Sequence, residues 1–438
     1  MPASSNPTLA DHNCRQFVLF RVLFNSRFYY PVLAILFLDL GLSATEYTLL
    51  NFAWALVIVV AEVPSGALAD RIGRRPLVIA AGACMVAEML VLGAAPQNGG
   101  LLLFLFCLLN RILSGLAEAL ASGADESLAF DALASEGRRD EWPAVLARVM
   151  RWQSAGMVVA MLVGSAIYDP HLLNRLTAAA GFGFRFELAT TLRFPIYLNL
   201  ITALAVLLVS LGMREPSRHN APALPAAYPV WHSVLEAGAW IIRTPLALFV
   251  IIGGLLIDSV IRLFLTFGSA YFRLIDLPEA SYGFIGAGMA GIGMVISPLA
   301  RRLVQGGSVA RCYGILALLT WLGLLGVALN IPFWGAVFAL PLAAIIAAVG
   351  FAVSHYLNVI VDAHHRATVL SFKGLAFNLG YGFISLLFAL ALRASRDSGH
   401  AAEGLADALA LLPLWFAGTM LLLGLLFWRH RAVLRRRY

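Results

Sequence analysis

The chain is 438 residues long, with 61% hydrophobic residues, 13% charged residues, a formal net charge of +7 and a mean hydropathy of +0.83. This balance lies far outside the range of soluble globular proteins and is typical of a membrane protein with many spans. The basic residues do not indicate nucleic-acid binding, because they are spread over short segments and a C-terminal tail, Arg429–Arg437. Orientation against an anionic inner membrane surface explains them better.

The N-terminus lacks the features of a cleaved signal peptide. Its polar opening, Met1–Asn13, leads directly into an apolar stretch that contains Arg21 and Arg27. A signal peptide instead has a basic start, a short apolar stretch and small residues at the cleavage site. We therefore expect the first apolar stretch to be retained as a helix.

Twelve apolar stretches follow one another along the chain, each near the length of about 20 residues that crosses a bilayer. They predict an all-α membrane protein with twelve transmembrane helices. Their approximate bounds are 16–41, 46–68, 77–96, 101–124, 144–168, 193–213, 246–270, 281–303, 310–330, 333–357, 367–392 and 410–428.

A polar segment divides the twelve stretches into two sets of six. Residues 214–245 contain four prolines followed by an amphipathic stretch, 230–243, and predict a cytoplasmic linker that carries a surface helix. The expected domains are therefore an N-terminal half, 1–213, this linker, and a C-terminal half with a basic tail, 246–438. A sequence similar to Leu68–Arg71 follows about 231 residues later as Leu299–Arg302, with Arg301 in place of the aspartate, and this faint repeat supports pseudo-symmetric halves.

The distribution of basic residues predicts the orientation. With both termini in the cytoplasm, the inner connections and the tail hold about 17 basic residues and the outer connections about 6. Lys373 is the only lysine, and such a preference for arginine is typical of a GC-rich bacterial genome. We expect both termini to be cytoplasmic and the protein to lie in a bacterial cytoplasmic (inner) membrane.

A short basic segment joins the second and third stretches and reads Gly66-Ala67-Leu68-Ala69-Asp70-Arg71-Ile72-Gly73-Arg74-Arg75. Two glycines allow a tight turn, while the aspartate and the arginines must lie in water or be paired. The segment resembles the inter-helix loop signature of the major facilitator superfamily, which comprises secondary transporters with two six-helix halves. The resemblance implies that fold and a mechanism of alternating access.

The resemblance also implies a conformational latch at the inner side. In this family the loop aspartate, here Asp70, interacts with the N-terminus of the eleventh helix. The loop arginine, here Arg74, pairs with an acid at the inner end of the fourth helix, for which Asp125, Glu126 and Asp131 are candidates. The expected latch consists of Gly66, Asp70, Arg71, Gly73, Arg74, Arg75, Asp125 and Asp131.

Two further elements bear on the resemblance. Arg111-Ile112-Leu113-Ser114-Gly115 looks like the RxxxG element of the family, which implies that Arg111 faces a cavity and takes part in proton coupling. The runs Glu62–Gly66 and Ser122–Glu126 look like those of bacterial efflux-type members. The fifth stretch departs from the pattern, because Gly156–Gly164 contains no proline where drug/proton antiporters often have a Gly-Pro element.

Ionisable residues at membrane depth are costly unless they are paired or face water. Asp258 and Arg262 are four residues apart, and Arg111 and Glu118 are seven apart, so each pair shares one helix face. They form either structural ion pairs or the lining of an aqueous cavity in which a carboxylate carries a proton, and both interpretations remain open. The expected cavity residues are Arg27, Glu88, Arg111, Glu118, Trp152, Asp258, Arg262, Lys373 and Asn378.

Two of these residues have specific expectations. Arg27 has no acid within a helical turn on its own stretch, so we expect it to be unpaired and open to an anionic substrate. Glu88 is a reserve proton carrier, because the third helix usually lies at the periphery of this fold.

The sequence contains no signature of an enzyme. It lacks the GxxxxGK[ST] phosphate loop, HExxH and GxSxG, and its four cysteines are scattered without CxxC spacing. His355, His364 and His365 near Asp362 have the positions of ordinary interfacial histidines. We expect no enzymatic activity, no cofactor and no metal site.

These observations predict a monomeric secondary transporter whose partners are a small-molecule substrate, protons and the lipid bilayer, with no nucleic acid. Proton-coupled export of a small organic molecule is the leading interpretation. One alternative is proton-coupled uptake of an anionic metabolite, suggested by the intramembrane arginines. Another is a membrane sensor or lipid-handling protein that transports nothing.

Overall fold

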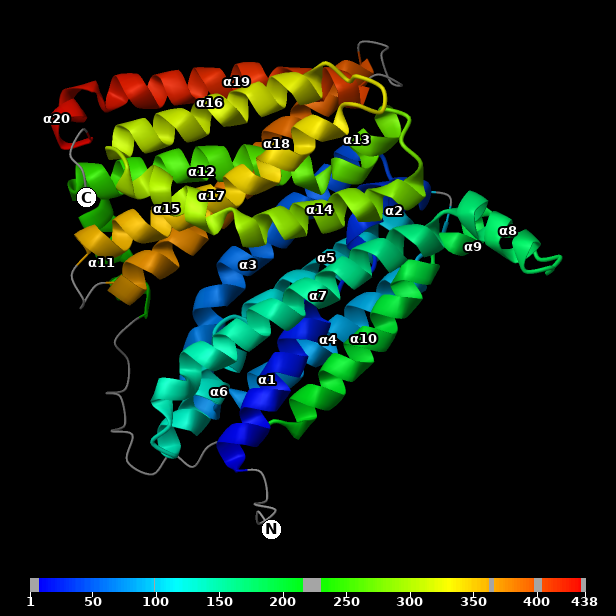
Figure 1. Cartoon of the computed structure of the whole chain (residues 1–438), viewed down its shortest axis with the longest axis horizontal. Coiled ribbons are helices and arrows are strands. Elements are labelled where there is room, and N and C mark those ends of the chain that lie inside the picture. The colour runs from blue at the N-terminus through cyan, green and yellow to red at the C-terminus, as the bar shows by residue number, and fades with distance from the viewer. Residues whose placement is uncertain (1–7, 98, 216–229, 362–365, 398–403, 435–438) are drawn as a thin grey trace. The chain divides into compact units, whose positions relative to one another are not determined.

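Every regular element of the described chain is a helix (Figure 1). The computed structural model describes residues 8–97, 99–215, 230–361, 366–397 and 404–434. These helices form two compact units, one from the described parts of 1–31 and 57–227 and the other from 32–56 and the described parts of 228–438. Helix α3 (Ala44–Ile72) gives its first part to the second unit and the rest to the first.

The first unit contains a set of long apolar helices with shorter ones at their ends. Its helices are α1 (Leu9–Asn25), α4 (Arg75–Gly93), α5 (Gly100–Ala121), α6 (Ala124–Ser135), η2 (Arg139–Glu141), α7 (Trp142–Tyr168), α8 (Pro170–Ala179), α9 (Leu188–Thr191) and α10 (Phe194–Gly212). The short η1 (Tyr30–Val32) follows α1.

The second unit has the same character. Its helices are α2 (Leu33–Asp39), α11 (Val230–Arg243), α12 (Pro245–Thr266), α13 (Gly268–Leu274), η3 (Glu279–Ser281), α14 (Tyr282–Val295), α15 (Ser297–Gln305), α16 (Val309–Ala328), α17 (Ala336–Ile360), α18 (Arg366–Asp397), α19 (Gly404–Leu426), η4 (Trp428–His430) and α20 (Arg431–Leu434).

The described residues contain ten helical segments long and apolar enough to cross a membrane, or eleven if the bent pair 139–168 and 170–179 is one span. The eighth expected stretch, 281–303, is split into α14 and α15, each too short to qualify alone. Pro298 lies in the first turn of α15, where its missing N–H favours a new helix start. A multi-pass helical membrane protein is confirmed, whereas twelve spans and cytoplasmic termini stay predictions.

The first expected span, 16–41, largely coincides with one apolar segment long enough to cross a membrane, Leu9–Asp39, but this segment is not a single helix. Helix α1 begins earlier, at Leu9, and the chain leaves the α-helical path between α1 and α2. Side chains satisfy the backbone there: Ser26 Oγ donates to the Val22 carbonyl (2.7 Å), and the Phe28 N–H donates to Asn199 Oδ1 (2.5 Å). An interruption at membrane depth is tolerated where the freed backbone groups find such partners.

The expected loop at 66–75 is also shorter than the sequence suggested. Helix α3 continues to Ile72, so Gly66 lies inside a helix and the turn is confined to Gly73 and Arg74. Gly73 has φ +96°, a conformation that favours glycine. The apolar and charged residues of 66–72 are compatible with helix, and only Gly73 breaks it.

Residues 32–56 group with the second unit rather than with the remainder of the expected N-terminal half. Ser269 Oγ accepts hydrogen bonds from the backbone N–H groups of Ala34 (3.0 Å) and Ile35 (3.2 Å) at the start of α2. Asp39 at its end accepts from both terminal nitrogens of Arg273 (2.6 and 2.8 Å). The exact domain ranges 1–213, 214–245 and 246–438 stay predictions.

Two glycines of α7 lie against the interruption of the first span. A Cβ on Gly156 would come within 2.6 Å of Ser26 Oγ, and a Cβ on Gly164 would overlap the Phe28 carbonyl oxygen. The small residues of this helix therefore serve close packing of helix against irregular backbone.

We expect Gly164→Ala to lower the stability of the protein by about 1–3 kcal/mol, the usual cost of overpacking, because the Phe28 backbone is held by Asn199 and cannot easily retreat. Gly418→Ala is the control, since a Cβ there meets nothing within 4 Å and alanine favours helix. The melting temperatures of the purified variants in one detergent measure the effect. Equal melting temperatures for Gly164→Ala and the unaltered protein would contradict this packing.

Candidate functional site

Arg27 lies at the centre of a buried charge network in the first unit. Its side chain is 1% exposed, and its Nη1 lies 3.0 and 3.2 Å from the two carboxylate oxygens of Glu88 on α4. The Tyr29 hydroxyl donates to the same carboxylate at 2.9 Å. A second acid, Glu118 on α5, places Oε1 3.5 Å from Arg27 Nη2.

The local backbone positions the arginine. Arg27 follows the end of α1, and its Nε donates to the Phe24 carbonyl at 3.0 Å, which satisfies one of the last carbonyls of that helix. Asn110 of α5 donates to the Glu88 carbonyl at 2.9 Å and thereby joins α5 to α4 beside the ion pair. The interruption of the first span thus brings a guanidinium to two neighbouring helices.

The expectation that Arg27 is unpaired is wrong. Its acids come from α4 and α5, and a search along its own span could not find them. Glu88, expected to be peripheral, is fully buried and holds Arg27 more closely than any other acid of the described chain. Arg111 is 5% exposed and lies two turns before Glu118 on α5, and the expected pairing of these two residues stays a prediction.

The second unit contains the pair that the sequence did predict. Arg262 Nη2 lies 2.6 Å from Asp258 Oδ2, one turn away on α12. Arg262 also donates to Asn378 Oδ1 of α18 at 3.0 Å and lies over the Tyr381 ring, 5.6 Å from its centroid. Lys373 is half-buried on the same helix as Asn378.

A third group of charges lies at the turn between α3 and α4. Arg74 pairs with Asp131 and also donates to the Ser127 carbonyl at 3.1 Å, so Asp131 is the partner among the three candidate acids. Asp125 instead pairs with Arg21 of α1 at 2.5 Å. Glu126 is exposed.

The same turn is tied to the end of α10. Arg75 Nε donates to the Met213 carbonyl at 2.6 Å, and Glu215 accepts from the backbone N–H groups of Arg74 (3.2 Å) and Arg75 (2.9 Å). A carboxylate at the start of a helix is favourable because the first N–H groups lack partners. The side chains of Asp70 and Arg71, like residues 362–365, lie outside the described part, so the expected contact of Asp70 is untested.

Trp152 does not lie with these networks. Its side chain is 56% exposed and lines a groove of about 630 Å³ between α1 and α7, together with Arg15, Val22 and Arg148. None of the expected ionisable cavity residues lines that groove.

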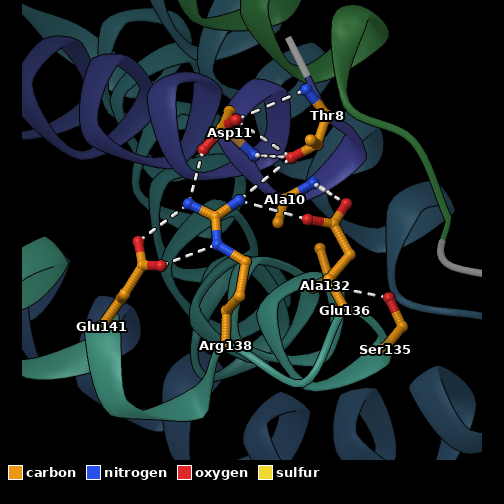
Figure 2. Close-up of polar contacts among 8 residues, drawn as sticks. All are labelled: Thr8, Ala10, Asp11, Ala132, Ser135, Glu136, Arg138 and Glu141. Atoms are coloured by element: carbon orange, nitrogen blue, oxygen red, sulfur yellow. Dashed lines mark hydrogen bonds and ion pairs between the residues drawn. The ribbon is translucent and has the colours of Figure 1, made fainter. Parts of the chain in front are cut away.

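An arginine between α6 and α7 forms a further cluster that the sequence did not single out. Figure 2 shows Arg138 among three carboxylates: Asp11 at 2.9 Å, Glu136 at 3.2 Å and Glu141 at 2.7 Å. Glu136 also accepts from the Ala10 N–H at 2.9 Å. The cluster fastens the start of α1 to the α6–α7 connection.

Within the described ranges, no group of three or more His, Cys, Asp or Glu residues is arranged to hold a metal ion. His355 stacks on Phe351 with ring centroids 6.4 Å apart. His364, His365 and Asp362 lie outside those ranges.

The helical spans are those of a multi-pass membrane protein, and comparison with known proteins gives its family. The family model of the Major Facilitator Superfamily matches residues 17–385. The chain belongs to the major facilitator superfamily. No curated protein matches the sequence. Membership in this family indicates a transporter rather than an enzyme.

Solved structures of family members share the fold. The chain is similar to the nucleoside transporter NupG, with a TM-score of 0.70, 14% identity, and coverage of 96% of this chain and 98% of that one. It is similar to a bacterial homologue of the human lysosomal transporter Spinster in an inward-facing, unoccupied conformation. The TM-score is 0.68 and the identity 17%, with coverage of 94% of this chain and 96% of that one. It is also similar to a D-xylose-proton symporter, with a TM-score of 0.61, 17% identity, and coverage of 92% of this chain and 96% of that one.

Several residues of these networks escaped the sequence analysis for an identifiable reason. Tyr29, Arg21 and Glu215 act across helices, and nothing in their spacing along the chain marks the partner. Tyr29 stands two residues from Arg27, which was a usable signal, because a phenolic hydroxyl can donate a hydrogen bond to a carboxylate. Asp39 and Arg273 form an ion pair although they are 234 residues apart, and no sequence pattern links two residues at that distance.

The Arg138 cluster predicts a pH dependence of the start of α1. The pKa of Glu136 lies below its usual value because the Ala10 N–H donates to its carboxylate and Arg138 lies beside it. A carboxylate whose pKa is lowered by folding stabilises the folded state at pH values above its usual pKa. This contribution is lost as the pH falls through the pKa of the folded state. We expect the Ala10 amide to lose hydrogen-exchange protection below about pH 4, after correction for the intrinsic rate.

Glu136→Gln is the control for this prediction, because the glutamine accepts the same hydrogen bond without titrating. Its Ala10 protection should show no change over that pH range. Identical pH profiles for Glu136→Gln and the unaltered protein would contradict the role of Glu136.

Proposed function

We propose that this transporter works by alternating access and exports a small organic molecule in exchange for protons, in a bacterial cytoplasmic membrane. The observation that carries the proposal is the sharing of one buried guanidinium, Arg27, by two carboxylates that are held unequally. Such a site lets one acid keep its charge while the other exchanges a proton.

Glu88 is the acid suited to remain ionised. It is fully buried, accepts from Arg27 at both oxygens and accepts from Tyr29, and removing that charge would leave Arg27 without its principal partner. Burying an unpaired charge costs several kcal/mol.

Glu118 is the acid suited to exchange a proton. Its contact with Arg27 is longer, 3.5 Å, and its side chain is 35% exposed. A proton on Glu118 would leave the ion pair of Arg27 and Glu88 intact, so protonation would break only the longer contact. The charges of Arg27, Arg111, Glu88 and Glu118 sum to zero when Glu118 is ionised.

This charge balance favours export over uptake of an anion. An ionised Glu118 can accept either a proton or a cationic or polar group of a substrate, and this competition is what exchange requires. Uptake of an anionic metabolite is suggested by several intramembrane arginines, but Arg27, the one expected to be open to an anion, is already engaged by two acids. A sensor or lipid-handling protein without transport remains the other alternative, and measurement of flux separates it.

Asp258 is the corresponding candidate in the second unit. Asp258 lies 2.6 Å from Arg262. Arg262 also donates a hydrogen bond to Asn378, and its guanidinium lies over the ring of Tyr381. Arg262 would therefore stay partnered if Asp258 took a proton.

We also propose that Arg74 and Asp131 form part of the inner latch. Their ion pair joins the turn before α4 to α6, and Arg75 and Glu215 join the same turn to the end of α10. Because these contacts join the turn to both α6 and α10, the three elements can move together when the substrate site switches from one side of the membrane to the other.

We expect Glu118→Gln to abolish flux driven by a pH gradient in proteoliposomes while leaving substrate exchange measurable. Asp258→Asn should reduce proton-driven flux in the same assay. Glu126→Gln is the control, because Glu126 is an exposed acid near the end of α5. Normal proton-driven flux in Glu118→Gln and Asp258→Asn together would reject the assignment of both carboxylates.

Glu88→Gln separates a structural acid from an exchanging one. We expect it to lower the free energy of unfolding by about 3 kcal/mol, since Arg27 loses its principal partner in a buried site. Glu118→Gln should cost much less, because its contact is longer and partly exposed. Thermal unfolding of the two variants gives the comparison, and equal losses would contradict the division of roles.

We expect Arg74→Ala and Asp131→Asn to slow transport more than they weaken substrate binding, because the latch acts between conformations. The two changes should have similar effects, and the double variant should be little worse than either. Equilibrium binding and maximal flux are measured side by side. A large loss of affinity with an unchanged maximal rate would reject the latch.

A further inference from the structure

A wholly apolar groove lies in the second unit and is lined by residues of α15, α16 and α17. Figure 1 labels these three helices. It has a volume of about 340 Å³, and every lining residue is apolar. Leu299 is 61% exposed, Leu319 is 46% exposed and Leu322 is 48% exposed, so protein covers these side chains only in part. Helices α16 and α17 are among the segments apolar enough to span a membrane.

One end of this groove is basic and free of acids. Arg302 follows the lining residue Leu299 by one helical turn on α15, and Arg311 lies in the first turn of α16. Arg301, the third arginine, contacts Gln305. No Asp or Glu occurs between Glu279 and Asp362 in the sequence.

The arginines are available to a ligand. Arg302 and Arg311 are exposed, and their guanidinium groups form no hydrogen bond or ion pair to any residue that the structure describes. Arginine side chains also extend along apolar surface while the guanidinium stays in water, which suits the edge of a groove at the membrane surface.

We propose that this groove binds one anionic phospholipid of the bilayer. One acyl chain lies in the apolar groove, and the headgroup phosphate accepts hydrogen bonds from Arg302 and Arg311. The apolar lining fits a hydrocarbon chain, and guanidinium groups without competing acids fit a phosphate. The site does not depend on the direction of transport or on its coupling ion.

The short break between α14 and α15 explains why the site exists. Ser297 and Pro298 begin a new helix, and α15 is strongly amphipathic, with Leu299, Ala300 and Leu303 on the groove and arginines beside them.

Native mass spectrometry of the purified full chain tests the proposal. The protein in detergent is titrated with phosphatidylglycerol or with phosphatidylcholine that carries the same acyl chains. We expect phosphatidylglycerol to bind about tenfold more tightly, and the double variant Arg302→Gln, Arg311→Gln to lose this preference. The matched control, Arg243→Gln with Arg429→Gln, neutralises two exposed arginines of the same unit outside the groove and should retain it.

A second variant tests the acyl chain. Ala344 lines the groove, and Ala344→Phe should fill it and weaken both lipids. If Ala344→Phe fails to fold, the arginine variants still decide, because they alter only exposed side chains. Retained preference for phosphatidylglycerol in the double arginine variant overturns the proposal.

The remaining outcomes identify other occupants. Displacement of phosphatidylglycerol by inorganic phosphate would mean an anion site without a chain, and it would overturn the lipid assignment. A dimer that loses its interface in Ala344→Phe would mean that a second copy covers the groove, with the same consequence. Phosphatidylglycerol that stays bound in excess phosphate, on a monomer, supports the proposal.

Discussion

A buried arginine has to be partnered, and in this protein that requirement shapes the first membrane unit. Arg27 reaches Glu88 only because the chain leaves the α-helix after Asn25 and turns its side chain toward α4 and α5. The interruption in turn needs partners for its own backbone, which Asn199 and Ser26 supply, and it needs glycines on α7 that permit close approach. The position of one charge pair therefore depends on several segments that are far apart in the sequence.

Charged side chains at the helix ends of the first unit are also partnered, but by backbone groups as well as by carboxylates. Near the turn at Gly73, arginines meet carboxylates and helix-terminal carbonyls, while Glu215 meets the first N–H groups of α4. These contacts are partly exposed, so each contributes little to stability by itself. Their common effect is to connect α4, α6 and α10 through one turn, which is a suitable arrangement for a unit that moves as a body.

The two units solve the problem of intramembrane charge differently, and the difference bears on mechanism. In the second unit Arg262 and Asp258 are neighbours on one helix, so their pairing survives any rearrangement that leaves α12 intact. In the first unit the pairs join different helices, so their geometry depends on how α4 and α5 pack against the segment that carries Arg27. Glu118 is held loosely across helices, so its contact with Arg27 depends on how those helices pack, which supports the proton-exchange role proposed for it.

The sequence by itself determined the class of protein, most of its spans and the local pair of Asp258 and Arg262, because these depend on composition, apolar length and spacing within one helix. It also narrowed the partner of Arg74 to three acids. Only the tertiary structure selected Asp131 among them, assigned Glu88 and Glu118 to Arg27, and broke the first and eighth spans. These outcomes depend on which helices pack together and how they are rotated, and contacts between residues far apart in the chain leave no periodic trace in a single sequence.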